Sequence, residues 1–182
     1  MTMQAFARRG FQLRTAPVET RLAYTSFLLL MLPGIATLVA LSVGRMGLSP
    51  AAIAAHYRGG ESEMSFPKTV WQLVEVSHFH LFTVPIVVLI LSHLLYGTPA
   101  SARLRIWLTS ITFLGAFLDA VGPWSVRYLS AGFSYVLLIG WIFLSGGAFV
   151  IVMVTLLAMW GPKRWFDNAK VSPRSTTRDD GP

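Results

Sequence analysis

The sequence predicts an all-α integral membrane protein: a four-helix bundle with a short interfacial helix in the loop between the first two spans. Hydrophobic residues make up 54% of the chain and charged residues only 13%, a composition typical of a membrane protein rather than of a soluble domain. Each of four apolar runs approaches or exceeds the roughly 20 residues that a helix needs to cross a bilayer: 22–44, 71–96, 106–122 and 129–160. We therefore expect a transmembrane domain over residues 22–160, between an N-terminal segment, 1–21, and a C-terminal tail, 161–182.

The first span is predicted to be a permanent membrane helix. Its apolar run is longer than that of a secretory signal peptide, and no small-residue cleavage pattern follows it. The next loop contains a helix start, in which Ser49 is the expected N-cap and Pro50 the first helical residue. We expect a short helix over 51–57 that is ended by Gly59 and Gly60 and lies along the membrane interface.

The net charge of +7 reflects where lysine and arginine stand around the spans and does not indicate a nucleic-acid site. Basic residues are concentrated before the first span, between the second and third spans, and after the fourth: Arg8, Arg9, Arg14, Arg21, Arg103, Arg105, Lys163, Arg164, Lys170, Arg174 and Arg178. Because loops rich in lysine and arginine stay in the cytoplasm, we expect both chain ends to be cytoplasmic. The expected location is a bacterial inner membrane, with a disordered tail after Trp165.

Inside the four apolar runs, the second run carries four of the five Asp, Glu, His, Lys and Arg residues: Glu75, His78, His80 and His93. At about 100° per residue, Glu75 and His78 share a helix face to which His93 returns, whereas His80 is expected roughly 140° away. Glu75 and His93 are separated by about 27 Å along the helix axis, so they cannot belong to one small site. Chemistry is therefore expected near the outer end of this span, around Glu75 and His78.

The third span brings an acid to the same depth, because Asp119 lies nearly level with Glu75 and His78 once the chain has turned outward again. An isolated acid in the centre of a membrane helix costs about 2.5–3.5 kcal/mol, so we expect Asp119 to face a partner. The sequence thus predicts a cluster of Glu75, His78 and Asp119 in the periplasmic leaflet. Three further residues lie near this surface: His56, His80 and Arg127.

One interpretation of the cluster is a transition-metal site. A Glu-x-x-His motif places a carboxylate and an imidazole on one helix face, as in the di-iron sites of helical bundles. Nitrogen and oxygen ligands suit Zn, Cu or Fe. The candidate metal ligands are Glu75, His78, Asp119 and His56. Carboxylate-bridged sites repeat the motif on a second helix, and this chain does not.

A second interpretation is haem b, with His78, His80, His93 and Met159 as candidate ligands. His80 and His93 lie on one helix in the manner of paired cytochrome b ligands, but the other three spans contain no histidine. A self-contained bis-histidine dihaem protein is therefore excluded. A single haem between His93 and Met159, or a haem shared between subunits, stays open.

A third interpretation needs no cofactor. A hydrogen bond from His78 to Asp119, and a contact of Glu75 with Arg127, would tie the second and third spans together. In the fourth span, the small residues at 145–148 would let another helix approach closely.

Several motifs resemble those of an uncharacterised family of small four-helix proteins of the bacterial inner membrane. They are Tyr57-Arg58-Gly59, Phe66-Pro67, the stretch from Leu73 to Phe82 around His78, Asp119, and the stretch from Pro123 to Tyr128. The similarity extends from the first span to the end of the fourth. The resemblance implies the fold and implies that the segment around His78 is a unit, but it brings no activity with it.

The expected function is that of an inner-membrane electron-transfer or metal- or haem-binding subunit, with its site in the periplasmic leaflet. The absence of cysteine excludes disulfides, iron–sulfur clusters and covalently attached haem. No phosphate-binding glycine loop or nucleophile elbow is present, so a self-contained enzyme is not expected. The alternative is a structural or assembly subunit without a cofactor, and an ion pathway is a third candidate that lacks an acidic relay. The expected partners are lipid, other membrane subunits or further copies of the chain, and no nucleic acid.

Overall fold

The computed structural model describes residues 12–60 and 66–162. The predicted all-α membrane bundle is confirmed: four helices are long and apolar enough to cross a bilayer, and the last three of them bury more of their residues than the first does. The predicted disordered tail falls on residues 163–182, outside the described residues.

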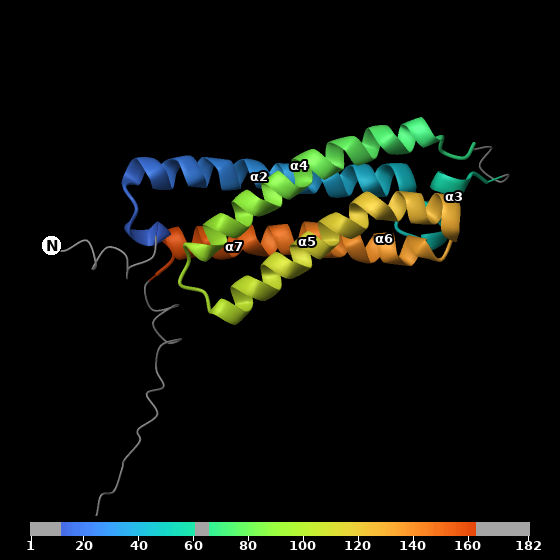
Figure 1. Cartoon of the computed structure of the whole chain (residues 1–182). Helices are drawn as coiled ribbons and strands as arrows, with labels where there is room; N and C mark the ends of the chain where they lie inside the picture. The colour runs from blue at the N-terminus through green and yellow to red at the C-terminus, as the bar shows by residue number, and fades with distance from the viewer. Residues whose placement is uncertain (1–11, 61–65, 163–182) are drawn as a thin grey trace, which may run out of the picture.

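The four spans run alternately up and down (Figure 1). They are α2 (Val18–Met46), α4 (Val70–Tyr96), a third span of α5 (Ala102–Trp124) and η3 (Ser125–Leu129), and a fourth of α6 (Phe133–Trp141), η4 (Ile142–Gly146) and α7 (Gly147–Trp160). Here η3 and η4 are π-helical segments, which widen a helix by one residue per turn and are frequent at functional sites. The sequence did not indicate either of them.

A short helix, α3 (Pro50–Arg58), lies across one end of the bundle, which we call the α3 end (Figure 1). It begins as predicted, because the Ser49 hydroxyl accepts a hydrogen bond from the Ala52 N–H, and it ends at Gly59, whose φ of 81° favours glycine. Ile53 and Tyr57 are buried against the ends of the second, third and fourth spans. The helix therefore closes this end of the bundle.

The inward face of α4 is formed by residues spaced three or four apart: Leu73, Ser77, His80, Val84, Val88, Leu91 and Leu95. The stripe that contains Glu75, His78 and His93 is exposed along its whole length. His80 lies on a different face from Glu75, as predicted, but the expectation that the face of Glu75 and His78 is the one turned into the bundle is wrong. The error arose because α4 is apolar on every side, so the ionisable residues were taken to mark the inner face.

The third and fourth spans approach each other closely where α5 crosses α6 and η4. A Cβ atom at Gly115 would lie 2.4 Å from the Leu144 nitrogen, and one at Gly140 would lie 2.8 Å from the Leu118 Cβ. At Gly147, in the small-residue stretch, it would clash with the Thr112 side chain. This close packing places Asp119 of α5 opposite α6.

At the opposite end of the bundle, hydrogen bonds to backbone carbonyl oxygens join the helix ends. The η1 turn (Leu13–Thr15) donates from the Leu13 N–H to the carbonyl of Gly97 at 3.0 Å. Arg21 donates to the Met159 carbonyl at 2.7 Å and stacks over the Trp160 ring, and Arg105 donates to the Tyr96 carbonyl at 2.9 Å. Cationic groups at helix C-termini are favourable because the helix dipole is negative there.

Candidate functional site

A buried carboxylate near the α3 end joins three helices. One oxygen of Asp119 on α5 accepts a hydrogen bond from His80 Nδ1 on α4 at 2.5 Å. Its other oxygen accepts a hydrogen bond from the Trp141 indole of α6 at 3.0 Å. Asp119 is only 7% exposed, so both carboxylate oxygens are held by protein donors and not by solvent. We call these three residues the His80–Asp119–Trp141 triad.

The triad fixes the orientation of one imidazole. With Asp119 ionised, Nδ1 is the ring nitrogen that carries the proton toward the carboxylate, and Nε2 of the neutral imidazole is the nitrogen left to accept a second partner. Among the described residues, none bonds to Nε2, and the His80 side chain is 28% exposed. His80 is therefore a preoriented acceptor that something outside the bundle can approach.

Tyr57 of α3 lies close enough to the triad to sense its charge. Burial raises the pKa of the Tyr57 phenol, and the negative charge of Asp119 raises it further. The residue is 8% exposed and packs with Leu73, Val126 and Leu137. The phenol is therefore kept protonated beside the carboxylate.

The surrounding shell is held by further cross-helix bonds. The Trp124 indole donates to the Ser77 hydroxyl at 2.7 Å, one turn of α4 away from His80. Arg58 donates to the Val126 carbonyl at 3.1 Å, and Arg127 donates to the Lys68 carbonyl at 3.1 Å. These bonds fix α3 and the start of α4 against η3, which closes the α3 end around the triad.

The structure does not bring the predicted metal ligands together. Asp119 meets His80 instead of His78, while Glu75 and His78 are exposed on the other side of α4. Arg127 bonds to the loop and does not reach Glu75. Within residues 12–60 and 66–162, no three His, Cys, Asp or Glu side chains are placed to hold a metal ion.

The other candidate ligands are also dispersed. His56 lies on α3, where its ring meets that of Tyr57 edge-on at 5.0 Å. His93 is exposed at the opposite end and lines a pocket of about 360 Å³ with Tyr24 and Leu89. Met159 is 2% exposed in an aliphatic cluster and does not line that pocket. Of the candidate ligands, His80 is the one whose imidazole a carboxylate orients.

Sequence reasoning missed the two tryptophans that complete the site, Trp141 and Trp124. The sequence could have pointed to both, because an indole N–H inside a span needs an acceptor on a neighbouring helix. Asp119 and Ser77 are the acceptors that such a search would have offered. Tyr57 was visible only as part of a motif, because its proximity to Asp119 depends on how α3 folds back over the bundle.

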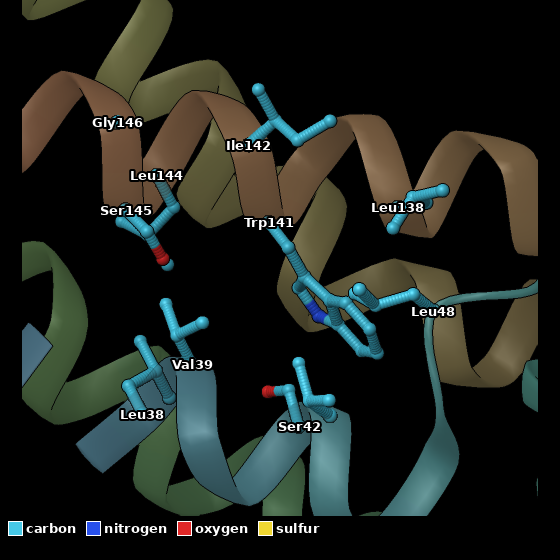
Figure 2. A pocket seen from close by; sticks show the side chains of 11 residues that line it. Leu38, Val39, Ser42, Leu48, Leu138, Trp141, Ile142, Leu144, Ser145 and Gly146 are labelled. Atoms are coloured by element: carbon cyan, nitrogen blue, oxygen red, sulfur yellow. The ribbon is translucent and has the colours of Figure 1, made fainter. Parts of the chain in front are cut away.

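An apolar pocket of about 280 Å³ lies beside the triad, between α2 and the fourth span. Figure 2 shows the Trp141 indole standing between Leu48, Ser42 of α2 and its own helix. The same side chain therefore forms the wall of this pocket and holds Asp119. Ser145 and Gly146 of the π-helical segment η4 also line this pocket.

Comparisons with known proteins agree with the membrane architecture. No curated protein and no solved structure matches the chain. A family model, Aq_1264_TM, described as a transmembrane helical domain, matches residues 47–165, which is more than half of the chain and includes α3 and the last three spans. The chain therefore belongs to this family of transmembrane helical domains.

Proposed function

We propose that the protein is an inner-membrane subunit that contributes His80 to a redox centre, a haem iron or a transition-metal ion, shared with another subunit. The observation that carries the proposal is the hydrogen bond between His80 Nδ1 and Asp119. Metal-ligating histidines almost always donate their other ring N–H to a carboxylate, a carbonyl or water, which fixes the tautomer and makes the ligand more basic. His80 has this arrangement, with Nε2 directed away from the carboxylate.

We infer a redox centre shared between subunits because the part of this chain that the structure describes offers it only one oriented ligand, His80. Among the described residues, no group of three His, Cys, Asp or Glu side chains forms around His80, and His80 lines neither the pocket beside Trp141 nor the one at His93. A partner subunit would supply the remaining ligands and the rest of the housing. The partial exposure of His80 gives such a partner access.

A structural or assembly role is the second candidate, and one observation favours it. Asp119 has both oxygens satisfied by donors from α4 and α6, so the triad stabilises the bundle whether or not Nε2 binds anything. In this case a cofactor would be absent from the native complex.

The test is a reduced-minus-oxidised visible spectrum, with elemental analysis, of the complex isolated from native membranes in mild detergent. The wild-type protein is compared with His80→Gln and with His93→Gln, a matched control for an exposed histidine on the same helix. We expect haem bands or a stoichiometric metal in the wild type and in His93→Gln, and their loss in His80→Gln.

Asp119→Asn provides a graded test of the same site. The amide retains the size of the side chain but no longer stabilises the Nδ1–H as a carboxylate does, so we expect weaker cofactor retention, about 10–100-fold for a lost outer-shell partner. Equal cofactor content in wild type and His80→Gln would contradict the proposal. A native complex without haem or metal would favour the structural role.

A further inference from the structure

The outward face of α4 carries ionisable side chains that no residue of 12–60 or 66–162 covers. The face is a single exposed stripe, with a spacing of three or four residues: Glu75, His78, Phe82, Ile86, Leu89 and His93. It lies opposite the stripe that faces the bundle core and contains His80. No ion pair to Glu75 or His78 occurs among the described residues.

The depth of these residues makes their exposure informative. Trp71, 79% exposed, stands in the first turn of α4, where an aromatic side chain marks the membrane interface. At 1.5 Å per residue, Glu75 lies about 6 Å and His78 about 10 Å deeper along the helix. Ionisable side chains at such depths almost always face protein or a water-filled cavity. The stripe is therefore expected to be an interface.

We propose that this stripe pairs with the same stripe of a second copy, α4 against α4, with the carboxylate of Glu75 bonded to the imidazole of the partner's His78. All copies of a membrane protein insert with one topology, so two copies related by a two-fold axis along the membrane normal place their α4 helices parallel. A two-fold interface is self-complementary: if Glu75 meets the partner's His78, then His78 meets the partner's Glu75.

The choice of a second copy rests on the spacing of the two groups. Glu75 and His78 are three residues apart, so less than one helix turn separates them along α4. In a parallel second copy, the partner's imidazole therefore lies at nearly the depth of Glu75, and the partner's carboxylate at nearly the depth of His78. Around this pair, the stripe is aromatic and aliphatic; the His78 ring lies 5.0 Å from that of Phe82. Such a surface suits close helix packing with one buried polar pair.

The chain has no cysteine, which allows the interface to be mapped by single cysteines. Full-length Ile86→Cys is reconstituted at low density in phosphatidylethanolamine–phosphatidylglycerol vesicles and oxidised. Phe117→Cys on α5 and Leu30→Cys on α2 are matched controls, because both residues are also exposed in spans. We expect disulfide-linked dimers to form with Ile86→Cys much faster than with either control. Equal rates would overturn the proposal.

The polar pair is tested in the Ile86→Cys background. Glu75→Gln is expected to slow cross-linking about tenfold, because the dimer contains two interhelical bonds of this kind. Glu19→Gln, at an exposed acid of α2, is expected to leave the rate unchanged. The exchange Glu75→His with His78→Glu is expected to restore the rate, because both copies then carry the reversed pair.

An unchanged rate in Glu75→Gln, or no recovery in the exchanged variant, would contradict the reciprocal pair. The inference is independent of the proposed redox role, because His80 lies on the other side of α4 and the cross-linking measurement needs no cofactor. The two proposals can therefore fail separately.

Discussion

Three tryptophans in the spans each donate an indole N–H to an acceptor on another helix. Trp124 bonds to Ser77, Trp141 to Asp119 and Trp160 to Thr25. In hydrocarbon an unsatisfied donor is costly, so each of these bonds selects one arrangement of the two helices that it joins. Asp119 differs from the other two acceptors because it is ionisable and receives a second donor, His80, from a third helix.

The raised pKa of the Tyr57 phenol can be tested through the pH dependence of the protein's stability. Its pKa is raised by burial and by Asp119 from the ordinary value of 10.0, so the folded protein keeps the phenol protonated where the unfolded chain releases the proton. The stability that depends on this group is complete below pH 10 and is lost as pH rises above it, because the folded state then binds more protons than the unfolded state. The expected loss is about 1.4 kcal/mol for each pH unit.

Denaturant titration one pH unit below and one above the ordinary tyrosine pKa measures this loss. We expect Tyr57→Phe to lose less stability than wild type between the two pH values. Tyr135→Phe, a change at an exposed tyrosine, is expected to behave as wild type does. Identical pH dependence in wild type and Tyr57→Phe would show that the phenol is not held neutral by the fold.

At the scale of helices, the sequence was sufficient for the number of spans and for the cap of α3, because run length and capping residues are local signals. The sequence did not show which face of α4 turns toward the other helices. Aliphatic residues surround that helix, and the ionisable residues on its outward side outnumber His80 on its inward side. Only the partners on other helices, Asp119 and the two tryptophans, identify the inner face. The depth of Asp119 was predicted, but its partner was not.

The close packing of the third and fourth spans at glycine predicts the effect of a single added methyl group. Gly115→Ala places a methyl group 2.4 Å from the backbone nitrogen of Leu144, which cannot move without displacing η4. We expect a loss of about 1–3 kcal/mol, the usual cost of overpacking. Gly146→Ala is the matched control, because nothing lies within 4 Å of its added Cβ, and alanine favours the helix.

The measurement is the free energy of unfolding in mixed micelles. The expected order of stability is Gly146→Ala at or above wild type, with Gly115→Ala clearly below both. Equal stability of the two alanine variants would mean that the third and fourth spans are further apart than the structure places them.

The whole molecule is divided unevenly between a compact part and a peripheral helix. The family match begins at residue 47, directly after α2 ends at Met46. Among its described residues, α2 buries only Leu28, whereas the triad, α3 and both π-helical segments all lie within the matched part. The helices that form the site are therefore those that define the family, and α2 contributes chiefly one wall of the pocket beside Trp141.

The orientation of the molecule in the membrane decides on which side the triad operates. Four spans return the chain to the side on which it started, and the start of α5, which lies at that same end, carries Arg103 and Arg105. By the preference of such loops for the cytoplasm, we expect Ala131→Cys, in the turn at the α3 end, to react with a membrane-impermeant maleimide in intact spheroplasts. Ala102→Cys, at the opposite end, is expected to react only after permeabilisation, and the cysteine-free parent not at all. The reverse pattern would place His80 and Asp119 in the cytoplasmic leaflet. Reaction of both variants from outside would contradict the four-span topology itself, because these residues stand at opposite ends of the third span.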